Sequence, residues 1–395
     1  MSPPGLLFIV NSLGVGGAER QLLTLLAHLD PRRFRLHLAY LKQDERLLGQ
    51  VPHGQLEEVL CCEVRRRVDL SAVRRLRLLI EARSIDAVVC TNPYSMLYGT
   101  LALPRARRTA LATVFHSTLM HSVKQRAEML LYRRLFARCD LLVYVCENQR
   151  RYWREYGLEP RAERVIYNGI DTDHFTDTRT PAEQLAFRRS LGFEAEDFVV
   201  GLCSQLRPEK AHGDLLEALA RLRAQGLPAR GLLIGDGPER SRIERTLARL
   251  HLGGHVRITG NREDVRPYIR ACDVMTLCSH SETFSLAALE SMSLGRPLVM
   301  SAVGGAAEQI VPGRHGFLFA PGDVAGLTGH LTALSAPSLR GPLGAAAARS
   351  VRERFSVAAM TASFTECLEQ LVPARPPVRA HSGSPREATP ATPET

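Results

Sequence analysis

Lysine is almost missing from this chain of 395 residues, which contains only Lys42, Lys124 and Lys210. The formal net charge of +10 therefore comes from arginine. Aromatic residues are also scarce, at 6% with a single tryptophan, and none alternates with the arginine clusters. Because proteins bind single-stranded nucleic acids by stacking the bases on aromatic side chains set among basic ones, this composition argues against a nucleic-acid partner. Most of the arginines are expected on solvated faces.

Long apolar runs and paired cysteines are missing as well. Apolar runs such as residues 6–10 are far too short to cross a bilayer. Since no charged segment precedes that run and a glycine-rich loop follows it, we interpret it as a first strand and not a signal peptide. The nine cysteines form no Cys-x-x-Cys pair and have no histidine at zinc spacing. We therefore expect free, buried thiols in a reducing cytoplasm.

What the chain does contain is a regular alternation of strand-like and helix-like segments. With 45% hydrophobic residues, its length suits two domains of roughly 150 to 200 residues each. Such alternation predicts a parallel sheet with helices on both faces. In the first half the strands are expected at 6–10, 35–40, 86–90, 109–115 and 141–145, and the helices at 18–29, 73–82 and 123–137.

The same pattern restarts in the second half. Its strand-like runs, each followed by a helical segment, are residues 198–203, 230–234, 256–258, 274–277 and 297–300. The predicted fold class is therefore α/β, with two doubly wound Rossmann-like domains facing a cleft. The ligand site is expected in that cleft.

Composition also sets the expected domain limits. Residues 1–170 form the predicted N-terminal domain, the polar segment 171–191 the linker, and residues 192–355 the C-terminal domain. A last helix is expected at 356–371, crossing back to the N-terminal domain. The remaining residues, 372–395, are rich in Pro, Arg, Ser and Thr and are predicted to be disordered.

Two carboxylates eight residues apart stand out in the second half. Glu282 follows a buried strand, and Glu290 lies about two turns into the next helix, which Gly295 ends. The first backbone amides of a helix are suited to bind a diphosphate, and here they are expected at Phe284, Ser285 and Leu286. On its own, a pair of glutamates is typical of an ordinary surface helix.

Further motifs in a fixed order set this pair apart. They are a glycine-rich loop at 14–20, a strand end carrying His116, the segment 165–171, a lysine-bearing loop at 206–210, a strand-to-helix turn at 234–240, and glycines at 295 and 304–305. Together with Glu282 and Glu290 they cover residues 5–370. The whole pattern resembles retaining family 4 glycosyltransferases, with their Glu-x7-Glu motif and GT-B fold.

The resemblance implies roles for the matching residues. The donor would be a UDP- or GDP-sugar, a co-substrate that needs no metal and no other cofactor. Glu282 would contact the hydroxyls of the donor sugar, and Glu290 the ribose of the nucleotide. Lys210 would stabilise the departing diphosphate, and His116 would orient the donor sugar from the N-terminal domain. Backbone contacts with the donor are implied for Gly16, Gly17, Gly235, Phe284, Ser285 and Leu286.

One position departs from the family pattern. Family members usually carry arginine five residues before the phosphate-loop lysine, where this chain has Gln205. Glutamine can donate a hydrogen bond but brings no charge. On an extended strand end Gln205 and Arg207 would share a face, so Arg207 is the candidate replacement cation. The alternative function is a nucleotide-sugar-binding protein with weak or no turnover.

Two other patterns receive a plainer interpretation. Asp171 and Asp173 have the spacing of the metal-binding pair in the other large transferase fold, but they lie in the hinge segment, where a turn or helix cap is expected. The loop at 14–17 lacks the third glycine of a dinucleotide fingerprint, and no acidic residue ends the second strand near Tyr40. A nicotinamide-dependent reductase is therefore disfavoured.

A basic amphipathic helix is expected at 123–137. Such a helix covers a sheet or lies on an anionic membrane surface, and both can hold at once. Its basic residues are Lys124, Arg126, Arg133 and Arg134, followed by Arg138, and the face would be extended by residues 65–67 and by Arg105, Arg107 and Arg108.

These observations predict a cytoplasmic, metal-independent, retaining hexosyltransferase, peripheral at the cytoplasmic face of the inner membrane. Because family acceptors are often sugars on polyprenyl lipids, we expect a glycan or polyprenyl-linked sugar as acceptor, in polysaccharide or lipopolysaccharide assembly. The binding-only protein and a sugar-nucleotide epimerase are the alternatives, and the Glu282–Glu290 arrangement counts against the epimerase.

Overall fold

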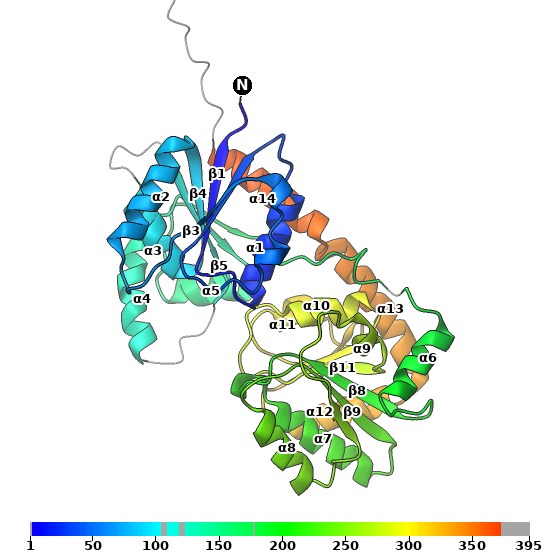
Figure 1. Ribbon diagram of the computed structural model, residues 1–395. Helices are drawn as coiled ribbons and strands as arrows, with labels where there is room; N and C mark the ends of the chain where they lie inside the picture. Colours follow the sequence, from blue (N-terminus) through cyan, green and yellow to red (C-terminus); the bar gives the residue numbers. More distant parts are fainter. Residues whose placement is uncertain (1, 104–108, 118–122, 177, 373–395) are drawn as a thin grey trace, which may run out of the picture.

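The computed structural model describes residues 2–103, 109–117, 123–176 and 178–372. They form two domains, one above the other in Figure 1, each built on a parallel β-sheet.

The N-terminal sheet has 7 strands in the order β3-β2-β1-β4-β5-β6-β7. Its strands are β1 (Gly5–Val10), β2 (Arg35–Tyr40), β3 (Leu56–Cys61), β4 (Ile85–Thr91), β5 (Ala110–Phe115), β6 (Leu141–Tyr144) and β7 (Glu163–Val165). The accompanying helices are α1 (Gly17–His28), α2 (Leu70–Ala82), α3 (Asn92–Ala102), α4 (Val123–Phe136) and α5 (Glu147–Glu155), with short 3-10 turns at Leu48–Gln50 and His53–Gln55.

The C-terminal sheet has 6 strands in the order β10-β9-β8-β11-β12-β13. Its strands are β8 (Phe198–Cys203), β9 (Ala229–Ile234), β10 (Val256–Ile258), β11 (Val274–Leu277), β12 (Leu298–Ser301) and β13 (Gly316–Phe319). The helices are α6 (Pro181–Ser190), α7 (His212–Ala224), α8 (Arg240–Arg249), α9 (Arg266–Arg270), α10 (Leu286–Ser293), α11 (Ala306–Gln309), α12 (Val324–Leu334), α13 (Pro337–Arg354) and α14 (Val357–Leu371), with a 3-10 turn at Pro208–Lys210.

Both sheets reverse their winding direction beside their first strand. β1 pairs with β2 and β4, and β8 pairs with β9 and β11, all in parallel. Loops that leave two such strands diverge, and doubly wound proteins bind ligands outside the carboxyl ends at this point. The predicted fold class, α/β with two doubly wound domains, is confirmed.

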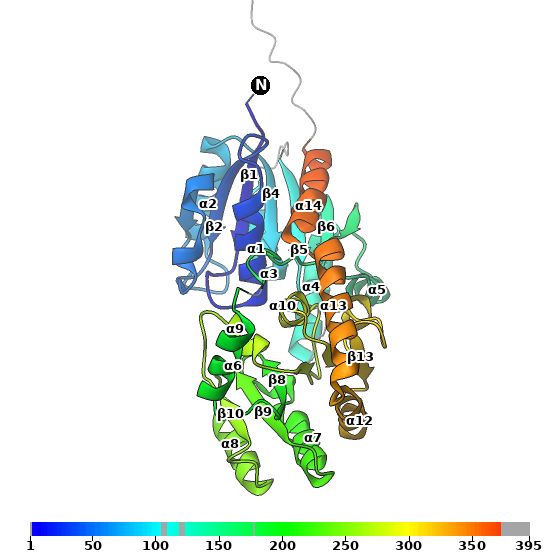
Figure 2. The same cartoon turned by 90° about the vertical axis from the view of Figure 1, so that its right-hand side faces the viewer.

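The central strands are apolar because helices cover both faces of each sheet. β1 and β8 are buried along their whole length. On the N-terminal sheet, α1 and α14 cover one face and the set from α2 to α5 the other (Figures 1 and 2). On the C-terminal sheet, α7, α8 and α12 pack on one face, while α10 and α13 pack on the opposite one.

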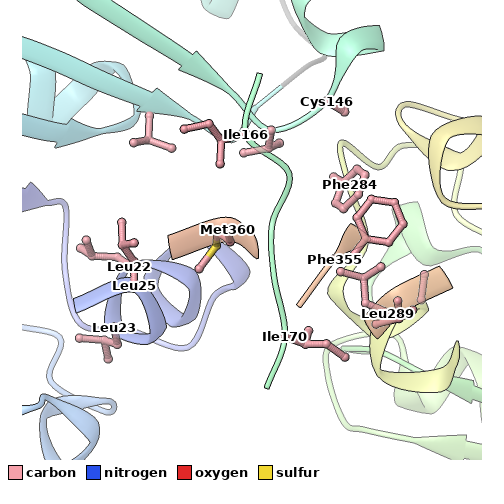
Figure 3. Close-up of a cluster of buried hydrophobic side chains, with 14 of the residues drawn as sticks. Leu22, Leu23, Leu25, Cys146, Ile166, Ile170, Phe284, Leu289, Phe355 and Met360 are labelled. Carbon is pink, nitrogen blue, oxygen red and sulfur yellow. The ribbon is translucent and has the colours of Figure 1, made fainter. Parts of the chain in front are cut away.

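The chain crosses between the domains twice, and the two crossings lie side by side. Ile170 forms a parallel bridge with Ser356, and the amide of Ile170 donates to the carbonyl of Phe355 at 2.9 Å. Side chains of both domains pack around the first crossing in Figure 3, among them Leu22, Leu25, Met360, Phe284, Leu289 and Phe355. Burial of each such side chain contributes roughly 1.5–3 kcal/mol, so one apolar core holds the domains together.

Most of the expected elements correspond to observed ones. The strands absent from the sequence prediction, β3, β7 and β13, lie at sheet edges. The helix expected at 356–371 is α14, which contacts α1 beside the N-terminal sheet (Figure 2). The expected linker contains α6. The domain limits themselves stay a prediction.

Some expectations lie outside the described residues. They are the disordered segment from residue 373 onward, the side chains of Lys124 and Arg126, and the whole of Arg105, Arg107 and Arg108. The nine cysteines are all free of disulfides, and eight of them are buried. Across the described part of the chain, no helix combines the length and apolar character that a bilayer crossing needs.

Candidate active site

The loops that leave β8 and β11 form the centre of the candidate site. Lys210 ends the turn after β8, and Glu282 lies in the loop after β11, at the point where the winding reverses. Their side chains form an ion pair, with Nζ and Oε2 2.5 Å apart and each side chain 21% exposed. The amide of His280 also donates to the carbonyl of Glu209 at 2.8 Å, which ties the two loops together. Lys210 and Glu282, which the sequence singled out separately, thus meet next to the switch point.

Backbone strain marks the residue that follows the lysine. Ala211 has a left-handed backbone with φ of +48°, which costs a non-glycine residue about 1 kcal/mol. This conformation ends the short 3-10 turn and starts α7 directly after Lys210. The strained backbone of Ala211 therefore lies next to the lysine that contacts Glu282.

The start of α10 differs from the expected one. Ser285 is the N-cap, and its hydroxyl accepts from the amide of Ala288 at 3.3 Å. The amide of Ser285 is not free, because it donates to the side-chain oxygen of Gln309 at 3.3 Å. Phe284 precedes the cap. The expectation of a free amide is therefore wrong for Ser285, whereas the amides of Phe284, Leu286 and Ala287 have no hydrogen-bond partner among the described residues.

Phe284 has a structural position instead. Its ring stacks on Tyr167 of the first crossing, with centroids 5.3 Å apart, and meets Phe355 of the second crossing edge-on at 5.5 Å. Gln309 holds the next residue from the other side, since its side-chain amide donates to the carbonyl of Ser285 at 2.8 Å. The loop that carries Glu282 is therefore anchored to the hinge between the domains.

Glu290 lies one turn after Leu286 on α10. Its carboxyl group is partly enclosed, and this burial raises its pKa, while Arg20 in the N-terminal domain lowers the pKa in opposition. A carboxylate in this position can accept hydrogen bonds from ribose hydroxyls. The role predicted for Glu290 remains a prediction.

Gln205 and Arg207 do not share the extended strand that was assumed. β8 ends at Cys203, and the amide of Arg207 donates to the carbonyl of Gln205 at 2.9 Å, which closes a tight turn. Arg207 lies 4.0 Å from Glu209 and lines a cavity of about 410 Å³ between α7 and α8. The expected shared face is wrong, because the strand ends before Gln205 and a tight turn follows it.

The predicted glycines lie where a side chain would clash or where the domains meet. A Cβ on Gly235 would come 2.0 Å from the carbonyl oxygen of Ser204, and its φ is +142°, so glycine is required there. Gly16 is the N-cap of α1. A Cβ on Gly17 would lie 3.6 Å from Leu286, which places the glycine-rich loop against the start of α10.

In the N-terminal domain, His116 directly follows the last residue of β5. Its amide donates at 2.9 Å to the side-chain oxygen of Asn92, a residue with φ of +69° at the end of β4. Burial lowers the pKa of His116 to about 4. The ring is therefore neutral at pH 7, as an orienting hydrogen-bond partner would be.

The depressed pKa of His116 predicts a pH-dependent stability. An unfolded histidine titrates near 6.5, so between that value and the folded pKa of about 4 the unfolded chain binds more protons. The free energy of unfolding should therefore fall as the pH is lowered through this window, by about 1 kcal/mol at pH 5.5 from His116 alone. Urea unfolding at pH 7.5 and 5.5 measures this loss, which should shrink in His116→Gln. An equal loss in both proteins would contradict the assignment.

The sequence analysis did not single out two residues of α11, of which Glu308 connects the domains and Gln309 holds the loop before α10. The carboxylate of Glu308 accepts the amides of Glu147 and Asn148, at the start of α5, each at 2.8 Å. Burial first, and then Glu308, raises the pKa of Tyr167 to about 12. Gln309, the residue after Glu308, holds the Glu282 loop through its hydrogen bonds to Ser285. The glycine pair at 304–305, directly before α11, was the sequence signal that pointed to this segment.

The remaining motif has a structural explanation. The side chain of Asp171 accepts the amides of Asp173 and His174 at 3.0 and 2.9 Å, which confirms the expected turn. Among the described residues, no three His, Cys, Asp or Glu side chains are grouped to hold a metal ion.

Both halves of the chain match known families of glycosyltransferases. Residues 15–174 match the family described as Glycosyltransferase Family 4, and residues 197–336 match Glycosyl transferases group 1. EpsD of Bacillus subtilis, a provisionally assigned glycosyltransferase, is 27% identical over 290 residues, which cover 70% of this chain and 75% of that protein.

A second relative and a solved structure extend this comparison. The GDP-mannose-dependent monoacylated alpha-(1-6)-phosphatidylinositol monomannoside mannosyltransferase of Corynebacterium glutamicum is 27% identical over 306 residues, 74% of this chain and 78% of that protein. The crystal structure of Anabaena HepE in complex with UDP superposes with a TM-score of 0.82 at 23% identity, covering 93% of this chain and 100% of that one. The structural likeness shows a shared fold.

Proposed function

This chain is a glycosyltransferase of family 4 with the GT-B fold, and we propose that it is a retaining hexosyltransferase that needs no metal or other cofactor. The donor is a UDP- or GDP-hexose. The observation that carries the proposal is the ion pair of Lys210 and Glu282. It lies beside the open amides of α10, opposite the glycine-rich loop of the other domain.

The proposed reaction breaks the bond between the anomeric carbon and the diphosphate oxygen. The bonding electrons leave with the nucleoside diphosphate, the acceptor hydroxyl attacks from the same face, and its proton passes to the departing diphosphate. Negative charge develops on the diphosphate, so fixed cations and amides lower the barrier. In our proposal Lys210 and the amides of Leu286 and Ala287 supply that stabilisation. Glu282, released from Lys210, contacts the sugar hydroxyls, and neutral His116 orients the sugar.

The donor base and the acceptor class draw support from similar proteins. HepE was crystallised with UDP, and the name of the corynebacterial relative specifies GDP-mannose and a lipid-anchored sugar. We propose a glycan or polyprenyl-linked sugar as acceptor, within polysaccharide or lipopolysaccharide assembly. The reaction would take place at the cytoplasmic face of the inner membrane.

Helix α4 is the proposed contact with an anionic membrane. Leu130 is 69% exposed on this helix, and Arg133 and Arg134 near its end are exposed as well. An apolar side chain among arginines suits the boundary between headgroups and acyl chains. Turnover that needs a lipid extract in the following experiment would support this location.

The experiment that tests the proposed function is nucleotide release from UDP-, GDP-, ADP- and dTDP-sugars. We expect release from one donor, strongest with an acceptor lipid extract, and its loss in Glu282→Ala. Glu353→Ala, an exposed position on α13, is the matched control and should behave like the wild type. Silence with every donor and extract, combined with a nucleotide-dependent rise in melting temperature, would favour the binding-only alternative.

A further inference from the structure

One side of α1 is turned toward the other domain. Gly17, Arg20 and Gln21 are three and four residues apart and therefore share a side of the helix. At Gly17 this side meets α10, because a Cβ added to Gly17 would lie 3.6 Å from Cδ1 of Leu286. At Gln21 the side-chain amide donates to the carbonyl of Gly169 at 2.9 Å and accepts its amide at 3.0 Å. Contacts on both sides of Arg20 thus fix its direction.

Arg20 itself is exposed and uncommitted. No hydrogen bond or ion pair joins its guanidinium to any residue that the structure describes, whereas its backbone amide donates a hydrogen bond to the carbonyl of Gly16 at 3.1 Å. Some other exposed arginines of the domain pair locally, as Arg32 does with Asp30 at 3.2 Å. A long cation without a carboxylate partner, on a helix face that meets another domain, is available to a ligand.

Two groups of the candidate donor site are within reach of the charge of Arg20. Burial raises the pKa of Glu290, and the charge of Arg20 opposes this shift. Burial likewise raises the pKa of Cys203, and Arg20 again opposes it. Cys203 ends β8 two residues before Gln205, while Glu290 lies one turn beyond Leu286. Arg20 therefore faces the site between α10 and the start of the phosphate loop.

The other charged residues near the donor site leave few cations for a diphosphate. Lys210 is paired with Glu282, and Arg207 lines the cavity between α7 and α8. Gln205 is uncharged. A nucleoside diphosphate brings at least two negative charges, and guanidinium groups bind such oxygens in a bidentate manner.

We propose that Arg20 is the second cation of the donor site: it crosses from the N-terminal domain and binds the diphosphate of the sugar nucleotide, in the place of the charge that Gln205 does not supply. The proposal rests on the proposed function. When the donor is absent, Arg20 faces Glu290. When the bond to the sugar breaks, its guanidinium stabilises the charge that accumulates on the leaving diphosphate.

The test compares Arg20→Ala, Gln205→Arg and the double variant, with Arg32→Ala as a control of equal charge on an unrelated face. Binding of UDP and GDP, and of uridine and guanosine without phosphates, is measured by calorimetry together with donor turnover. We expect Arg20→Ala to weaken binding of the active nucleotide roughly tenfold, to reduce turnover by on the order of 10²-fold, and to leave nucleoside binding unchanged. Gln205→Arg should restore both values in the double variant to near those of the wild type.

Several outcomes would overturn the proposal. Unchanged nucleotide binding and turnover in Arg20→Ala would refute it. So would an equal gain from Gln205→Arg in the presence and absence of Arg20, because the two positions would then act independently. Equal losses of nucleotide and nucleoside affinity would point to a structural role. If neither nucleotide bound the wild type, the proposed function would fail together with this role.

Discussion

Replacing Lys210 by methionine is expected to reduce turnover of the sugar nucleotide by roughly 10²- to 10³-fold, the usual loss when one fixed donor to a developing charge is removed. The lysine is placed by the strained Ala211 and by contact with Glu282. In the proposed mechanism its ammonium exchanges the carboxylate for the diphosphate when the donor binds. Methionine preserves the length of the side chain but cannot stabilise the leaving group.

Steady-state kinetics with the active donor measures this effect. Lys210→Arg keeps the charge and should retain more activity than Lys210→Met. Arg249→Met is the control, since it removes a cation that lies 3.6 Å from Glu217 outside the site, and it should leave kcat and KM unchanged. A methionine variant with wild-type kcat would exclude Lys210 from the chemistry.

Gly304→Ala is expected to cause the second large effect, on folding stability and activity together. The φ of Gly304 is +54°, and a Cβ there would lie 2.0 Å from the carbonyl oxygen of Glu282 and 2.8 Å from that of Thr283. Both atoms are backbone and cannot rotate away. A left-handed alanine costs about 1 kcal/mol, and displacement of the packed loop adds roughly 1–3 kcal/mol. The loop that carries Glu282 must therefore move.

Thermal unfolding and donor turnover report the two consequences. We expect a lower melting temperature and a loss of turnover of at least about tenfold, since shifts of about 1 Å in catalytic groups are costly. Gly322→Ala separates backbone strain from collision, because Gly322 has φ of +79° and open space around it. It should lower stability slightly and spare activity. Equal effects of both substitutions would rule out the collision with the Glu282 loop.

The position of Arg20 changes the meaning of Gln205. From the sequence, glutamine at the usual arginine position favoured either Arg207 as replacement or a protein without turnover. The tight turn at Gln205 means that Arg207 does not share a strand face with it, and the role of Arg207 stays a prediction. A cation from the other domain would restore the charge only when the domains are in contact, which would link donor binding to their closure.

Much of the fold was predictable because its central strands are short apolar runs between amphipathic helices. β1 and β8 are buried at every residue, so their sequences are nearly uniform. The edge strands β3, β7 and β13 were missed, because each has a neighbour on only one side and its sequence is less apolar or shorter. The β-strand propensity of such edge segments is weak, and whether they form strands depends on pairing with a neighbouring strand.

The candidate site shows the same division. Spacing and motif order in the sequence singled out Glu282 and Lys210, and the topology brings them together because both follow strands at the switch point. The state of the Ser285 amide was not predictable. It depends on Gln309, which is 24 residues away, and no local pattern records that hydrogen bond.

The sequence by itself determined the two α/β domains, the central strands and the loops that carry the paired carboxylate and lysine. These features depend on periodicity and on residues close together in the chain. Only the tertiary structure decided that Arg207 lines the cavity between α7 and α8, that Glu308 caps a helix of the other domain, and that the charge of Arg20 acts on Glu290. Each of these depends on surfaces more than a hundred residues apart or on the course of a turn, and packing, not local propensity, brings such surfaces into contact.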